Sequence, residues 1–108
     1  MVGLNALRVL AGTRLASVMG AGEHQEGFYC NYGVNEEFRA RFERAGLRIS
    51  ALGLDGEIRG VERLDHPFYL ATLFQPQLTS VATGRAHPLL LAYLRTVREH
   101  TGATQYIA

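Results

Sequence analysis

The sequence of 108 residues predicts one small domain built from both strands and helices. Three observations support this prediction. Residues 47–51 alternate apolar and polar side chains, residues 68–74 form a nearly continuous apolar run, and residues 35–45 repeat apolar side chains at helical spacing. Such alternation is typical of a half-buried strand, a short apolar run of a strand covered on both faces, and helical spacing of an amphipathic helix.

Two short apolar segments, residues 4–10 and 14–19, lie near the N-terminus. They predict either two short strands or a strand followed by a helical turn. Residues 20–22 read Gly-Ala-Gly and predict a flexible connection. The aromatic-rich residues 28–34 predict a further strand, although Gly33 near its end disfavours strand structure.

The helix predicted over residues 35–45 has a capping residue at each end. Asn35 caps the start, and the two glutamates that follow favour the positive end of the helix dipole. Phe38, Phe42 and Ala45 are predicted to share its apolar face. Gly46 ends the helix, because glycine accepts a left-handed conformation.

A hairpin and a final helix are predicted in the second half of the chain. The strands at residues 47–51 and 57–64 are joined by a turn at Asp55-Gly56. The apolar strand at 68–74 follows and is ended by Pro76. The last helix opens at His87-Pro88, and its buried stripe is predicted to contain Leu90, Tyr93 or Leu94, and Val97.

Composition and charge exclude several classes of protein. Hydrophobic residues make up 47% of the chain, which is typical of a globular domain, and no apolar run approaches the roughly 20 residues that span a bilayer. With a net charge of +1 and dispersed arginines, we expect no nucleic-acid or membrane partner. The N-terminus does not resemble a signal peptide, and a single cysteine fits a reducing cytoplasm. We expect no cofactor.

One ordered series of short motifs runs from residue 26 to about residue 95. The series comprises Glu26, Tyr32, Val34 and Asn35, then Ala45–Ser50, Asp55-Gly56, Val61-Glu62, His66-Pro67-Phe68, Phe74, Pro76, Ser80 and His87-Pro88-Leu89. In order and spacing it resembles the glutamine amidotransferase domain of CTP synthase. The chain also resembles the CTP synthase C-terminal-region-related proteins, some of which are described as selenoproteins.

This resemblance implies an α/β fold, namely the C-terminal half of a flavodoxin-like class I glutamine amidotransferase domain, with a mixed sheet and flanking helices. Residues 1–108 would then be a single, partial domain. Either the chain is a fragment, or another chain or a second copy completes the domain. The apolar strand at 68–74 supports a covering chain, because it would otherwise leave a hydrophobic edge or face in water.

Gln75 and Gln77 stand where the resembling enzymes have the catalytic histidine and its orienting glutamate. An amide cannot act as a general base near neutral pH. The two side chains either line a pocket that binds a polar ligand or are remnants at a strand end. The Gly-x-Cys-x-Gly turn of the family's nucleophile is also absent, as is its Arg/His run between Gly27 and Val34. We therefore expect no hydrolysis of glutamine.

The segment around Cys30 corresponds to residues that face the substrate in the resembling enzymes, so the candidate ligand-binding residues are Glu26, Tyr29, Asn31 and Tyr32. Cys30 is a candidate reactive thiol. Such a thiol needs a lowered pKa from a nearby cation, a helix N-terminus or a metal. The nearest basic residues in the sequence are His24 and Arg39, and neither is obviously placed for this role. A buried, inert cysteine is the alternative.

The remaining polar residues have simpler interpretations. The four histidines do not have metal-ligand spacing, and two of them precede proline, as turn histidines do: His24, His66, His87 and His100. We expect Glu23, His24 and Glu26 to lie on a loop between glycines, either solvated or around a cation. We expect Arg39, Arg41, Arg44 and Arg48 to form a solvated helix face.

Three functions follow from these interpretations. The first is a degenerate amidotransferase module that binds a ligand or partner without hydrolysing glutamine. The second is an enzyme that uses the Cys30 thiol on another substrate. The third is one half of a split amidotransferase, whose partner would have to supply the base as well as the nucleophile.

Overall fold

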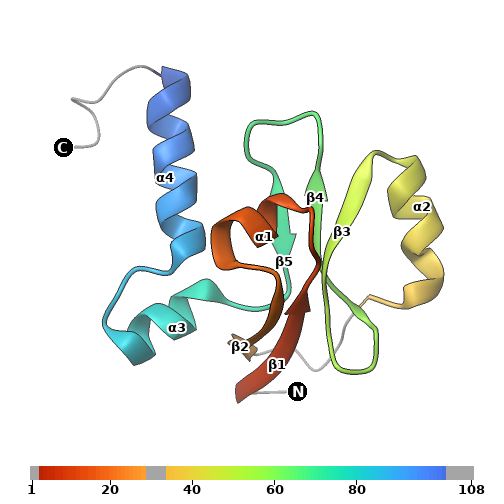
Figure 1. Cartoon of the computed structure of the whole chain (residues 1–108), viewed down its shortest axis with the longest axis horizontal. Helices are drawn as coiled ribbons and strands as arrows, with labels where there is room; N and C mark the ends of the chain where they lie inside the picture. Colours follow the sequence, from red (N-terminus) through yellow and green to blue (C-terminus); the bar gives the residue numbers. More distant parts are fainter. Residues whose placement is uncertain (1–2, 29–33, 102–108) are drawn as a thin grey trace.

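The computed structural model of the chain describes residues 3–28 and 34–101 (Figure 1). The strands are β1 (Gly3–Val9), β2 (Gly22–Phe28), β3 (Leu47–Leu52), β4 (Ile58–Arg63) and β5 (Leu70–Thr72). The helices are α1 (Arg14–Met19), α2 (Arg39–Arg44), α3 (Pro76–Thr83) and α4 (Pro88–Thr101), and a 3-10 turn, η1 (Glu36–Phe38), precedes α2. The α/β class with flanking helices is thereby confirmed.

The strands form one sheet in the order β2-β1-β3-β4-β5. Each pairing among the described strands is antiparallel, whereas the resemblance implies a mixed sheet. The reason is local: β3 and β4 are joined by a turn of five residues, and a parallel pair would need a long crossover. β1 pairs with β2 along its whole length but with β3 at only two residues, so the sheet can splay and curl there.

Of the two alternatives for the N-terminal segments, a strand followed by a helix forms. Thr13 caps α1 by accepting a hydrogen bond from the N–H of Ala16 (3.0 Å). Leu15, in the first turn of α1, is fully buried. β2 begins at Gly22, in the segment where the sequence predicts a flexible connection, and ends at Phe28. Residues 29–33 of the strand predicted over 28–34 lie outside the described residues.

The helix predicted at 35–45 is shorter than expected. Asn35 does cap it, since its Oδ1 accepts a hydrogen bond from the N–H of Glu37 (3.1 Å). The first turn is a 3-10 turn, which rotates the following residues relative to a continuous α-helix. Phe42 is consequently half-buried, while Phe38 is 39% exposed and Ala45 is exposed. The prediction that these three residues share one apolar face against the core is therefore wrong. The hairpin turn is confirmed, with Gly56 at φ +81°.

The apolar segment at 68–74 is not a central strand. Only Leu70–Thr72 is strand, and β5 forms one edge of the sheet, with Tyr69 45% exposed beside it. Pro76 not only ends this segment but is also the first residue of α3. The apolar run therefore reflects packing of Phe68, Leu70, Leu73 and Phe74 into or against the core, and not coverage of both faces of a strand.

The predicted buried stripe of α4 is wrong for Leu90 and for Tyr93 or Leu94, while Val97 is half-buried. Leu90, Tyr93 and Leu94 are each at least 41% exposed, and Leu89 is the helix's buried residue. α4 leans against α1 at one side of the molecule, opposite α2, so only a narrow part of its surface is covered (Figure 1). None of the described helices has the length and apolar character that crossing a membrane would require.

The core lies where the two ends of the sheet approach each other. Its buried cluster contains Leu7, Val9, Leu15, Phe28, Ala51, Phe74 and Leu89. Phe28 at the end of β2 meets Phe74 edge to face, with ring centroids 6.4 Å apart. The N–H of Gln75 then donates to the carbonyl of Gly27 (2.8 Å). The curl of the sheet thus joins residues 26–28 to residues 74–78.

Candidate functional site

Gln75 and Gln77 lie at the junction of β5 with α3. Gln75 is the N-cap residue of α3, is half-buried, and has an extended backbone (φ −107°, ψ 103°). Gln77 lies one residue beyond Pro76, in the first turn of the helix, and is exposed. Two amides at this junction can donate and accept hydrogen bonds, but they cannot accept a proton from a thiol or from water.

Gly27 fixes the position of α3 on β2. A Cβ atom at this residue would lie 2.7 Å from Cδ1 and 2.8 Å from Cβ of Leu78, which is closer than real contacts allow. Leu78 therefore occupies the space above Gly27 that a side chain would need. An arginine or histidine at this position, as in the Arg/His run that the resemblance implies, would require Leu78 to move.

Glu26 is a buried strand residue, so its predicted place in a glycine-flanked loop cluster with Glu23 and His24 is wrong. It lies on β2 and is only 4% exposed, whereas Glu23 on the same strand is exposed. Its Oε1 accepts a hydrogen bond from the hydroxyl of Thr79 (2.8 Å), and its Oε2 pairs with Nε2 of His87 (3.1 Å). Both carboxylate oxygens thus already accept hydrogen bonds from the protein, while its predicted role in ligand binding stays a prediction.

The contacts of His87 define its tautomer. Nδ1 accepts a hydrogen bond from the N–H of Leu89 (3.0 Å), so Nε2 is the nitrogen that donates to Glu26. The backbone N–H of His87 donates to the hydroxyl of Ser80 (2.9 Å). Through its ring and its backbone, His87 therefore ties α3 and the start of α4 to β2. The interpretation of His87 as a turn histidine with satisfied hydrogen bonds is confirmed.

His66 is likewise a turn residue. Its Nδ1 accepts a hydrogen bond from the N–H of Phe68 (3.0 Å) in the loop that leads into β5. In the same loop, Arg63 donates to Asp65 (2.6 Å), and this hydrogen bond holds the pKa of the Asp65 carboxyl below its ordinary value. Across residues 3–28 and 34–101, no group of three histidine, cysteine, aspartate or glutamate side chains is placed to hold a metal ion.

The arginines do not form a single solvated face. Arg39, Arg41 and Arg44 do lie on α2, but Arg48 is a residue of β3. Its Nη2 lies 2.5 Å from Oε2 of Glu62, a carboxylate that is 2% exposed and also accepts the N–H groups of Arg14 and Leu15 at the start of α1. The interpretation of Arg48 as part of a solvated helix face is wrong, because the Val61-Glu62 strand places a buried anion beside it.

The free edge of β5 presents unpaired backbone groups. The N–H of Arg63 donates to Tyr69, and the N–H of Leu73 donates to Arg59. In an antiparallel ladder that alternates in this way, the backbone N–H and C=O of Leu70 and Thr72 point away from β4. Among the described strands none pairs with this edge.

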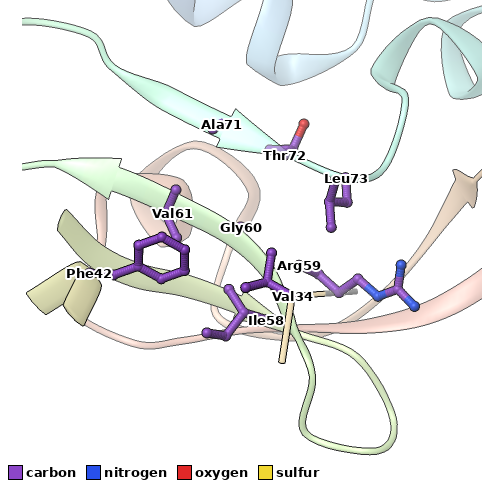
Figure 2. A pocket seen from close by; sticks show the side chains of 9 residues that line it. All are labelled: Val34, Phe42, Ile58, Arg59, Gly60, Val61, Ala71, Thr72 and Leu73. Carbon is purple, nitrogen blue, oxygen red and sulfur yellow. The ribbon is translucent and has the colours of Figure 1, made fainter. Parts of the chain in front are cut away.

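An apolar pocket of about 120 Å³ adjoins the same edge (Figure 2). It is lined by Val34, Phe42, Ile58, Arg59, Gly60, Val61, Ala71, Thr72 and Leu73. The Arg59 guanidinium points aside from Phe42 and Val61 in Figure 2, since it pairs with Glu57 (3.2 Å) and lies 5.0 Å from the Phe28 ring centroid. The cavity is therefore suited to an aliphatic or small aromatic group.

Sequence reasoning found the β5–α3 junction but missed this pocket. No local pattern signals it, because its walls come from β4, β5, α2 and Val34, which lie far apart in the sequence. Tyr29, Cys30, Asn31 and Tyr32, four of the predicted site residues, lie outside the described residues.

Comparisons with known sequences and structures relate the chain to CTP synthases. No protein-family model matches the chain. The chain is 32% identical to a CTP synthase of Phenylobacterium zucineum over 83% of its own length and 16% of that protein, and 34% identical to a CTP synthase of Rhodospirillum centenum over 86% and 17%. It is 38% identical to a CTP synthase of Treponema pallidum over 75% and 14%. The chain thus spans about one-sixth of the length of these curated relatives.

A solved structure shows the same fold. The glutaminase domain of the Trypanosoma brucei CTP synthase, with bound acivicin, superposes with a TM-score of 0.73 at 21% identity. The match covers 91% of this chain and 40% of that chain. The antiparallel sheet with its flanking helices is therefore the arrangement found in part of a class I glutamine amidotransferase domain.

Proposed function

We propose, from the premise that this chain is related to the glutamine amidotransferase region of CTP synthase, that it is a binding module that does not hydrolyse glutamine. The observation that supports this most directly is the β5–α3 junction. There the half-buried Gln75 and the exposed Gln77 stand where the resemblance implies a base and its orienting acid. The buried Glu26–His87 pair cannot take over that role, because both partners are already engaged in holding α3 and α4.

The proposed partner is a second polypeptide that carries the part of such a domain that this chain does not span. Two features support it. The free edge of β5 offers the backbone groups of Leu70 and Thr72 to an added strand, and the adjacent apolar pocket offers space for one of that strand's side chains. This combination is characteristic of binding by strand addition, in which backbone bonds give affinity and pockets give specificity. The matched solved chain extends well beyond the region that this chain covers.

The assembled module would bind a small polar ligand at this junction. The exposed Gln77 offers one acceptor and two donor hydrogens where the partner strand would flank the site, beside Gln75. The single cysteine of the chain is in keeping with a cytoplasmic site of action, which is part of this proposal. Thiol chemistry at Cys30 stays a prediction of the sequence alone.

The prediction that the module does not hydrolyse glutamine is tested by measuring glutamate release from L-glutamine. The sample is the complex as purified from cells that make the protein. We expect no release above the protein-free control, because no described group at the junction can act as the base. The double variant Gln75→His/Gln77→Glu, made in the same complex, tests the split-enzyme alternative. Glutamate release only from this variant would show that the rest of a glutaminase site survives.

Two outcomes would contradict the proposal. Glutamate release by the unaltered complex would show that it is an active glutaminase, with the partner supplying the base. Release that is abolished by Cys30→Ser would identify the thiol as its nucleophile. The matched control is Gln77→Ala, which removes the exposed amide and introduces no titratable group.

A further inference from the structure

A second pocket, of about 380 Å³, lies between α1, α4 and the loop that precedes β5. It is lined by Arg14, Val18, Pro67, Phe68, Ala92, Arg95, Thr96, Glu99 and His100. Its size is in the range of pockets that accept small molecules, roughly 300 to 1,000 Å³. Its walls come from two helices and the loop before β5, so the fold itself brings these side chains together.

Two arginines face a single carboxylate in this pocket. Arg14 contributes a guanidinium from α1 and Arg95 contributes one from α4, His100 adds an imidazole, and Glu99 is the one carboxylate in the lining. Within residues 3–28 and 34–101, the side chains of Arg14, Arg95 and His100 have neither a hydrogen bond nor an ion pair with another residue. Guanidinium groups that converge on a concave surface without protein carboxylates to pair with are suited to an oxyanion.

The other walls of the pocket are apolar. Val18, Pro67, Phe68 and Ala92 lie beside the cationic groups. The Phe68 ring is held by an edge-to-face contact with Tyr93, with centroids 5.5 Å apart and an interplanar angle of 65°. The hydroxyl of Thr96 donates to the carbonyl of Ala92 (2.9 Å), which leaves the arginines as the principal donors. The pocket thus offers an ionic end and a flat apolar wall.

We propose that this pocket binds an organic phosphate, with the phosphate between Arg14 and Arg95 and the organic part against Phe68. A phosphate ester matches the donor set better than a carboxylate does, because a doubly charged group with three terminal oxygens can pair with two guanidiniums at once. Glu99 opposes the anion and moderates its affinity.

Isothermal titration calorimetry at fixed ionic strength tests this site, with phenyl phosphate, inorganic phosphate and benzoate as probes. We expect phenyl phosphate to bind more tightly than inorganic phosphate, and benzoate to bind most weakly. Arg95→Gln should weaken phenyl phosphate binding by about 10-fold, the loss of one charge-assisted interaction. Arg98→Gln, on α4 but outside the pocket, should change it by less than about 2-fold.

Glu99→Gln should change the affinity for phenyl phosphate in the opposite direction. Removal of this carboxylate should tighten phenyl phosphate binding by about 2- to 5-fold, because a repulsive charge at the pocket is lost. Arg95→Lys keeps the charge but not the planar fork, and should give an intermediate affinity. Circular dichroism of each variant would verify that the fold is retained.

Several results would overturn the proposal. Absence of any measurable heat with phenyl phosphate at millimolar concentrations would show that the pocket takes no such anion. Equal weakening by Arg98→Gln and Arg95→Gln would indicate attraction to the whole helix and not a site. Benzoate binding as tightly as phenyl phosphate would remove the preference for phosphate.

Discussion

At the scale of single residues, two neighbours in β2 decide how the N-terminal part of the chain meets the C-terminal part. Gly27 makes room for Leu78, and Glu26 accepts hydrogen bonds from Thr79 and His87. A glycine and a carboxylate that look like surface residues in the sequence are thus placed by contacts more than 50 residues away along the chain. The pattern of neighbouring residues in the sequence contains no information about such long-range contacts.

Gly27→Ala tests the close packing against Leu78. The added methyl group would overlap the Leu78 side chain, so we expect a loss of about 1–3 kcal/mol in the free energy of unfolding. Leu78→Gly in the same chain would remove both clashing atoms, Cδ1 and Cβ, so the double variant should lose less stability than the sum of the two single variants. Urea denaturation of all four proteins measures this coupling, and strict additivity would contradict the packing described.

At the scale of elements, α4 has both a buried and an exposed apolar side. Leu89 is 7% exposed and belongs to the core, whereas Leu94 is 49% exposed. The regular spacing of leucines in the sequence predicts an amphipathic helix correctly, but it cannot tell which side the rest of the molecule covers.

Leu89→Ala should therefore cost about 2–5 kcal/mol of unfolding free energy, the usual loss for a buried leucine. Leu94→Ala should change it by less than about 0.5 kcal/mol. Thermal and urea unfolding of the isolated chain would show this difference. A larger effect at Leu94 would mean that this face is covered in the free protein and would contradict the exposure described.

The elements that the sequence predicts well are those defined by local chemistry. Asn35 caps the η1–α2 segment, Asp55-Gly56 turns the β3–β4 hairpin, and His87-Pro88 starts α4. The errors fall where long-range pairing decides. The apolar run at residues 68–74 indicates burial, but that burial comes from the curl of the sheet around Phe74 and not from strands on both sides.

The candidate site was predictable in the same uneven way. The resemblance alone implies that Gln75 and Gln77 stand where related enzymes have a catalytic pair, and this prediction needs no structure. The pocket in Figure 2 was not predictable, because it is formed by β4, β5, α2 and Val34, which come together only through pairings that join distant segments.

At the scale of the whole molecule, the sheet has two edges of different character. β2 is covered along part of its length by α3, and its Gly27 carbonyl accepts a hydrogen bond from the N–H of Gln75. β5 has only β4 as a neighbour among the described strands and borders an apolar pocket. Exposed edges of this kind recruit other strands unless they are protected. This asymmetry is the physical basis of the proposed partner.

The most direct test is native mass spectrometry of the protein purified from cells that make it, with the associated chains identified by sequence. We predict a complex of this chain with a second polypeptide related to the remaining part of the CTP synthase glutaminase domain. Thr72→Pro, which removes an outward N–H of β5, should separate the two, whereas Thr72→Val should not. A lone chain, a pair of identical copies, or a complex unaffected by Thr72→Pro would contradict the account.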